Sequence, residues 1–201
     1  MLDFAAERAG VMPCAGIDEA GRGPWAGPVV AAAVVLDPAR LPPGLDDSKK
    51  LTAARRAVLF DALTTVAAIG VGRAEADEID ALGILLANDL AMRRALAALP
   101  GPPARVLIDG NRVPPGLPCA AEAVVRGDGS VLSIAAASIV AKVTRDRIMA
   151  ALALDFPHYG WEHNAGYGTA AHRAALLQHG VTPLHRRSFA PIHKMLCECG
   201  T

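Results

Sequence analysis

The apolar positions of the chain form short β-branched runs first and helical repeats later. Residues 11–17 and 29–36 are apolar runs joined by a turn rich in glycine and proline, and they predict two neighbouring strands. Shorter runs at residues 67–73, 105–108 and 120–125 predict three further strands. The longest apolar run, residues 29–36, is far too short to span a bilayer, so we expect no membrane partner.

Four predicted helices begin with residues suited to a helix N-terminus. Thr52, Ser133 and Thr169 are the predicted N-caps of three of them, and acids at residues 77–80 occupy the first turn of the fourth. These helices are expected from Thr52, from Asp77 to Pro100, from Ser133 to about Leu154, and from Thr169 to Gly180. Residues 181–201 are predicted to be mostly irregular.

Strands that come first and are then interleaved with helices predict an α/β fold with a mixed sheet flanked by helices. The chain has 201 residues, enough for one domain with a full core and a small appendage. We expect residues 1–155 to form the core and residues 156–201 to form a small helical C-terminal extension packed on it, within one functional domain.

Charge and cysteine content exclude some classes of protein. The 20 basic and 20 acidic residues balance, which argues against a sequence-blind nucleic-acid coat protein. Local basic clusters remain, and each is either a solvated face or a contact for a polyanion; they are Lys49, Lys50, Arg55 and Arg56, and further on Arg186, Arg187 and Lys194. Four cysteines without C-x-x-C spacing argue against zinc and fit a cytoplasmic location, as does the lack of a signal-peptide pattern.

Acidic residues stand at the ends of three predicted strands. Asp18 and Glu19 end the first, Asp109 ends another, and Asp128 follows a third one glycine later. Ligands gather at the carboxyl ends of strands in α/β sheets, so we expect these carboxylates to converge. Oxygen ligands without histidine or cysteine select Mg²⁺ or Mn²⁺. Taken singly, each acid is better explained as a turn or capping residue, and the metal site is favoured only by the coincidence of three strand ends.

One geometric condition applies to Asp18 and Glu19. Adjacent residues on a regular strand point to opposite faces of the sheet. The two side chains therefore share a metal site only if the strand bends or ends there, for which Gly21 provides a plausible break. Otherwise Glu19 would contribute through its backbone carbonyl.

Several short motifs follow one another from about residue 14 to 191. They are GIDEAGRGP at residues 16–24, DSKKL at 47–51, IDG at 108–110, GD at 127–128 followed by SIAAASIVAKVTRD at 133–146, GYGT at 166–169 with His172, and RRSF at 186–189. In these motifs and in their order the sequence resembles the ribonuclease HII family. Two departures stand out. Ala165 occupies a position where many members carry lysine, which would weaken one backbone contact, and Ala190 replaces a glycine.

The resemblance implies an RNase H-like fold and an endonuclease that hydrolyses the RNA strand of RNA–DNA hybrids. It also implies incision on the 5′ side of a single ribonucleotide in duplex DNA, leaving 3′-hydroxyl and 5′-phosphate ends. Residues 1–155 would be the catalytic core. Two divalent cations, Mg²⁺ or Mn²⁺, are expected with substrate, held by the acids that match the family's metal ligands and catalytic residues: Asp18, Glu19, Asp109 and Asp128.

The resemblance also implies a set of substrate contacts. The backbone of Gly21, Arg22 and Gly23 would contact the 2′-hydroxyl, and Tyr167 would pack on the sugar next to the ribonucleotide. The expected phosphate contacts are Lys49, Ser138 and Lys142. The six histidines lack metal-ligand spacing, and we assign none of them a catalytic role.

Other functions stay open on the residues alone. A resolvase-like or integrase-like nuclease of the same fold would share the acids but not the Gly-Arg-Gly turn or Tyr167. A non-catalytic nucleic-acid-binding protein is a second alternative, against which four intact acids count. A nucleotide-phosphate loop fails on pattern, since no Walker-type sequence is present. We expect a monomer that binds RNA–DNA hybrid and ribonucleotide-containing duplex DNA; the sequence does not settle whether a sliding clamp binds.

Overall fold

The computed structural model describes residues 3–198. Its centre is a five-stranded sheet in the order β3-β2-β1-β4-β5. Strand β1 pairs antiparallel with β2 and parallel with β4, so the sheet is mixed, as the sequence predicted. The strands are β1 (Cys14–Ala20), β2 (Val29–Val35), β3 (Ala68–Ala74), β4 (Arg105–Asp109) and β5 (Ala120–Val124).

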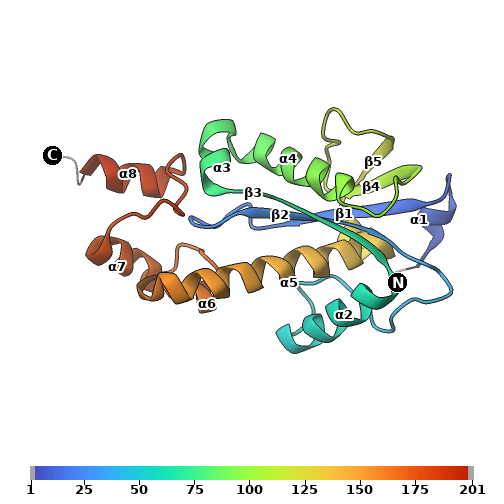
Figure 1. The fold of residues 1–201 in the computed structure, drawn as a ribbon, viewed down its shortest axis with the longest axis horizontal. Helices are drawn as coiled ribbons and strands as arrows, with labels where there is room; N and C mark the ends of the chain where they lie inside the picture. Colours follow the sequence, from blue (N-terminus) through green and yellow to red (C-terminus); the bar gives the residue numbers. More distant parts are fainter. Residues whose placement is uncertain (1–2, 199–201) are drawn as a thin grey trace.

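Helices cover both faces of the sheet (Figure 1). Helices α3 (Ala76–Leu82) and α4 (Ile84–Ala97) lie on one face, and α2 (Ala53–Val66) and the long α5 (Leu132–Asp155) lie on the other. Alternation along the strands creates two cores: Ile17 and Ile108 face the α4 side, whereas Ala32 and Val34 face α5. The predicted fold class is confirmed.

Gly16 brings the start of α5 against β1. A Cβ atom at this position would lie 2.1 Å from the backbone carbon of Ser133, a distance that no side chain tolerates. Because Gly16 has none, the first turn of α5 packs directly on the strand that carries Asp18 two residues later. This close packing places the segment before α5 beside the carboxyl end of β1.

Two of the three predicted N-caps are confirmed and one is wrong, and the acids Asp77 and Glu78 lie in the first turn of α3 as predicted. Thr52 and Thr169 accept hydrogen bonds from the backbone N–H groups three residues on, each at 3.2 Å. The helix predicted from Asp77 to Pro100 is wrong as a single element, because Gly83 adopts φ 77° and divides it into α3 and α4. Ser133 is not a cap either, because α5 begins at Leu132 and the Ser133 N–H donates to Glu7 in α1 (Ala5–Arg8).

The C-terminal part forms short helices beyond α5. They are η2 (Pro157–Tyr159), α6 (Trp161–Asn164), α7 (Ala170–His179) and α8 (Ala190–Glu198). The mostly irregular structure predicted for residues 181–201 is therefore wrong over α8, where Ile192 is buried in an apolar cluster; residues 199–201 lie outside the described residues. No helix within residues 3–198 has the length and apolar character needed to cross a membrane.

Candidate metal centre and nucleic-acid interface

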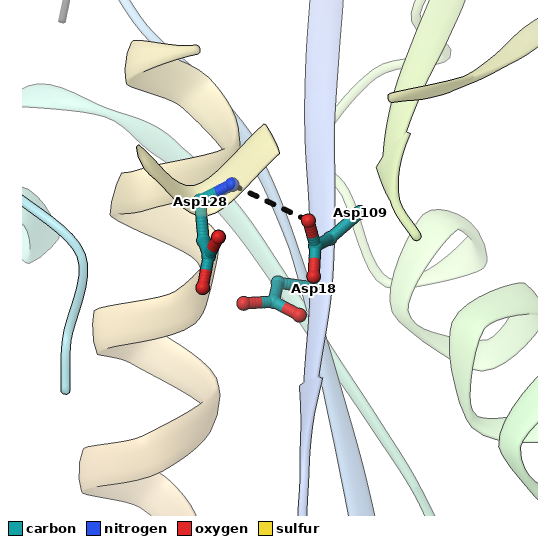
Figure 2. Close-up of side chains that lie close together, drawn as sticks. All are labelled: Asp18, Asp109 and Asp128. Carbon is teal, nitrogen blue, oxygen red and sulfur yellow. Dashed lines mark hydrogen bonds between the residues drawn. The ribbon is translucent and has the colours of Figure 1, made fainter. Parts of the chain in front are cut away.

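Three aspartates meet at the carboxyl edge of the sheet (Figure 2). Ile17 of β1 pairs with Ile108 of β4, so the next residues, Asp18 within β1 and Asp109 at the end of β4, lie side by side. Asp128 comes from η1 (Gly127–Gly129), the turn that precedes α5. One carboxylate oxygen from each of the three lies within 4.8 Å of the others. The convergence that the sequence predicted is thus present for these three acids.

Burial and mutual repulsion raise the pKa values of two of these carboxyl groups. Asp18 is 5 % exposed, and its pKa is raised well above the usual range by burial, then by the charges of Glu19 and Asp109. The pKa of Asp109 is raised by burial and by the charge of Asp128, although its Oδ1 accepts a hydrogen bond from the Asp128 N–H at 3.4 Å. Clustered hard oxygen donors that repel one another fit a divalent cation such as Mg²⁺ or Mn²⁺.

Glu19 follows Asp18 on β1, so alternation directs the two side chains to opposite faces of the sheet, although Glu19 still lines the cavity beside Asp18 and a depression that includes Asp109. Strand β1 continues through Ala20, which pairs with Val30, so the expected bend between Asp18 and Glu19 is absent. Glu19 lines a depression with Asn88 of α4 and accepts a hydrogen bond from Arg22 at 3.1 Å. The three-carboxylate group does not include Glu19, and its place among the metal ligands stays a prediction.

A cavity of about 190 Å³ adjoins Asp18 and gathers most of the predicted substrate contacts. Those in its lining are Gly21, Lys49, Ser138, Lys142 and Tyr167. Arg22 and Gly23 follow in the same turn outside this lining. The cavity also includes Ser48, Arg56 and Arg145, which our sequence analysis did not assign to the site. In the sequence, Ser48 and Arg145 were marked only by lying in motifs that match the family, and Arg56 only by lying in a basic cluster.

The three predicted phosphate contacts already have partners within the protein. The Lys49 ammonium donates to Asp128 Oδ2 at 2.7 Å, which raises the pKa of Lys49. Lys142 donates to Asp146 at 2.7 Å, and the buried Ser138 hydroxyl lies 2.6 Å from that of Ser48. Binding of a phosphate by these side chains would therefore involve an exchange of partners.

Tyr167 is half-exposed beside the Gly-Arg-Gly turn, with its Cε1 atom 3.6 Å from where a Cβ of Gly23 would stand. The backbone of Tyr167 is held by a buried histidine, because His172 Nδ1 lies 3.0 Å from the Tyr167 carbonyl. Trp161 Nε1–H can only donate to His172 Nε2, so the proton of His172 is on Nδ1 and is donated to that carbonyl.

A second buried histidine continues this network. His185 Nδ1 accepts from the Thr182 N–H at 3.0 Å, so its proton is on Nε2, which lies 3.0 Å from His172 Nε2. Both rings are therefore neutral. Burial lowers the pKa of His172, and burial together with the neighbouring His172 lowers the pKa of His185 to about 4.

One of the two predicted basic clusters is wrong as a surface patch. Arg186 is fully buried, whereas its neighbour Arg187 is exposed. The residues that precede Arg186 run beside residues 25–27, since Ala26 forms a β-bridge with His185 and the Arg186 N–H donates to the Trp25 carbonyl at 2.8 Å. Arg186 therefore supports the Gly-rich turn from within rather than offering its charge to solvent.

The sheet topology, the covering helices and the acidic edge define the class of protein: an RNase H-like nuclease. Solved structures support that class. A ribonuclease H2 from Pyrococcus horikoshii matches with a TM-score of 0.78 and 29 % identity, over 92 % of this chain and 97 % of that one.

The chain belongs to the ribonuclease HII family, whose model matches residues 15–192. It is 60 % identical over 195 residues to the ribonuclease HII of Ruegeria pomeroyi, which covers 97 % of this chain and 83 % of that protein. Identity to the ribonuclease HII of a Jannaschia species is also 60 %, over 97 % of this chain and 98 % of that protein. The protein is accordingly a hydrolytic endonuclease that acts on the RNA strand of RNA–DNA hybrids.

Proposed function

We propose that the enzyme also incises duplex DNA on the 5′ side of a single embedded ribonucleotide, and that its products carry 3′-hydroxyl and 5′-phosphate ends. The observation that carries the proposal is the meeting of Asp18, Asp109 and Asp128 within 4.8 Å, beside a cavity lined by Gly21 and Tyr167. Cleavage at a single phosphate requires a cation site for the reaction beside a surface that recognises the ribose at that position.

In this mechanism Asp18, Asp109 and Asp128 hold two divalent cations, and Glu19 completes the set of ligands. The chemistry supplied by the bound cations is activation of the attacking water and neutralisation of charge on the departing 3′ oxygen. Asp18 would be the central ligand residue, since its charge interacts with those of both Glu19 and Asp109 and it is one of the three carboxylates that meet at this edge. No protein nucleophile takes part.

Selection of the ribonucleotide is assigned to the turn at residues 21–23 and to Tyr167. A backbone amide and carbonyl can read a hydroxyl as both donor and acceptor, and the 2′-hydroxyl is what separates RNA from DNA at a given site. The half-exposed Tyr167 ring would pack on the adjoining deoxyribose and crowd a second 2′-hydroxyl. Lys49, Ser138 and Lys142 would contact phosphates once they release their present partners.

We further propose that residues 1–155 are the catalytic core and that residues 156–201 are an extension packed on it. Contacts support this division, since Trp161 and Ile192 share an apolar cluster with Ala26 and Met149. We propose a cytoplasmic monomer. A sliding clamp is the partner to test first, because an Archaeoglobus fulgidus ribonuclease HII, 28 % identical with a TM-score of 0.71, was solved in complex with PCNA.

The test is a cleavage assay on duplex DNA that carries one ribonucleotide, compared with the same all-DNA duplex and with a uniform hybrid. Each is incubated with Mg²⁺, with Mn²⁺ or with a chelator, and product ends are identified by treatment with phosphatase and ligase. We expect one incision 5′ to the ribonucleotide, only with metal. Cleavage of the hybrid without incision at the single ribonucleotide would reject the finer activity and leave the family activity intact.

A further inference from the structure

Arg186 lies fully buried beneath the Gly-Arg-Gly turn, and its guanidinium group donates to three main-chain carbonyls. Its Nη2 donates to the Gly21 carbonyl at 2.6 Å and its Nη1 to the Arg22 carbonyl at 3.0 Å. Its Nε donates to the Gly27 carbonyl at 2.9 Å. One guanidinium group therefore fastens both ends of the loop that follows β1.

Arg145 of α5 holds the same region from the adjoining side and is 1 % exposed. It donates to the carbonyls of Pro28 at 2.9 Å, Ala26 at 3.2 Å and Ala165 at 2.9 Å. The last contact reaches the loop that carries Tyr167. A Cβ at Gly21 would lie 1.9 Å from Arg145 Nε, so this guanidinium also packs directly on the backbone of the turn.

Neither arginine forms an ion pair with any acid whose side chain the structure describes. Burial lowers the pKa of Arg145 to about 10, and burial with the charge of Arg145 lowers the pKa of Arg186 to about 9, so both stay protonated at neutral pH. Burying two charges without an acidic partner lowers the free energy of unfolding, and two well-packed apolar side chains would give a more stable protein. Sites that break a folding rule in this way are commonly functional.

Peptide geometry indicates what the two groups accomplish. In a trans peptide the C=O and the following N–H point in opposite directions. The carbonyls of Gly21 and Arg22 point to Arg186, so the N–H groups of Arg22 and Gly23 point away from it. Arg186 thus sets the direction of both donors, and its charge orients the carbonyl dipoles more firmly than a neutral donor would.

We propose that Arg186, supported by Arg145, is a positioning residue that turns the N–H groups of residues 22 and 23 toward the substrate and so sets the preference for a ribonucleotide. The inference rests on the proposed function, in which this turn reads the 2′-hydroxyl. It adds a residue outside the cavity lining, more than 160 residues away in sequence, to the determinants of sugar selection.

The test compares Arg186→Lys with Arg187→Lys, a matched change at the exposed neighbour, both in an Asp109→Asn background that binds without cleaving. Lysine keeps the charge but cannot span three carbonyls as a planar fork does. We measure dissociation constants for a duplex with one ribonucleotide and for the identical all-DNA duplex over a range of salt concentrations. Thermal unfolding confirms that each variant is folded.

We expect Arg186→Lys to reduce the ribonucleotide preference about tenfold, the effect of one lost charge-assisted hydrogen bond. The salt dependence of binding to the all-DNA duplex should stay unchanged, because the charge count is the same. Arg187→Lys should retain the full preference. An unchanged preference in folded Arg186→Lys overturns the inference. If the parent itself shows no preference, the proposed function fails, and the inference fails with it.

Asp80 provides a second variant in case Arg186→Lys does not fold. Its carboxylate accepts from the N–H groups of Arg187 at 2.9 Å and Ser188 at 2.8 Å, so it anchors the segment that carries Arg186 from the surface. Asp80→Ala leaves both buried arginines in place but loosens that anchor. We expect a smaller loss of preference, about two- to threefold. Full preference in this variant, with Arg186→Lys unfolded, overturns the inference.

Discussion

The ammonium group of Lys49 lies 2.7 Å from Oδ2 of Asp128. A lysine proposed to contact a substrate phosphate therefore neutralises a carboxylate proposed to bind a metal ion. The lysine side chain is otherwise largely exposed, whereas the Asp128 side chain is 8 % exposed. The same oxygen of Asp128 can accept a hydrogen bond from this ammonium group or coordinate a metal cation. The two therefore compete, and metal binding is linked to the position of the segment at residues 46–51.

Lys49→Met is expected to strengthen the binding of Mn²⁺ without substrate by several-fold to about tenfold, because a competing positive charge leaves the cluster. The variant should bind RNA–DNA hybrid more weakly, since one phosphate contact is lost. The slope of the logarithm of the binding constant against the logarithm of the salt concentration should fall by about 1. Calorimetric titration with Mn²⁺ measures the first effect. Lys50→Met is the control, because that lysine pairs with Asp46. Unchanged or weaker Mn²⁺ binding in Lys49→Met contradicts the competition.

Asp109→Asn is expected to lower cleavage by about a thousandfold or more, because charge stabilisation by held cations is worth several kcal/mol. Binding of hybrid should persist. The assay is single-turnover cleavage beside a binding titration, with Asp155→Asn at the exposed end of α5 as control. Near-normal turnover in Asp109→Asn would reject its assignment as a catalytic acid.

In the metal-free protein, Asp109→Asn should also change how thermal stability depends on pH. The folded pKa of Asp109 is raised above the usual 3.8, so its contribution to stability is present below pH 3.8 and is lost as the pH rises through the raised value. Asp109→Asn should therefore unfold at a higher temperature than the parent at pH 7.5 with chelator, because the variant no longer buries this charge. Near pH 3.5 the difference should vanish.

Two glycines of one motif should respond differently to alanine. Gly21 has φ 94° and its Cβ would meet Arg145, so Gly21→Ala should lose about 2–4 kcal/mol of unfolding free energy as well as substrate selection. Gly23 has ordinary space, with Tyr167 at 3.6 Å, so Gly23→Ala should change stability by less than about 0.5 kcal/mol. Denaturant unfolding distinguishes them, and equal stability losses would contradict the packing explanation.

Tyr167→Ala should reduce the preference for an RNA–DNA junction over a uniform hybrid about tenfold, with little change in stability because the ring is half-exposed. Tyr167→Phe keeps the ring and should keep the preference. Competition between the two substrates in one reaction gives the ratio directly. A variant without the ring that still prefers junctions shows that Tyr167 does not select them.

Acid should unfold the protein through its buried histidines. His185 has a folded pKa of about 4 against an ordinary value of 6.5, so its stability contribution is complete above pH 6.5 and is lost as the pH falls toward 4. Each pH unit in that window costs roughly 1.4 kcal/mol for this group. Urea unfolding at pH 7 and pH 5 measures the loss. His185→Gln should flatten the dependence, whereas His163→Gln at an exposed site should leave it unchanged.

Local patterns were enough to predict the elements that depend on neighbouring residues. Short apolar runs predicted all five strands, and Thr52 and Thr169 were identified as caps because a capping side chain bonds three residues away. The split at Gly83 was missed, since the apolar repeat continues through it. Helix α8 was missed although Ile192 and Met195 stand at helical spacing, because its nine residues are fewer than the window over which a helical repeat is reliably recognised.

By itself the sequence determined the sheet, the acids at its edge and the family, because strand ends and motif order are local features of the chain. Only the tertiary structure decided that β1 continues without a bend through Glu19 and that Arg186 is buried under the turn. The physical reason is the same for both. The direction of the Glu19 side chain follows from the pairing of β1 with β2. The burial of Arg186 depends on hydrogen bonds to carbonyls more than 150 residues away. Neither can be inferred from the spacing of residues along the sequence.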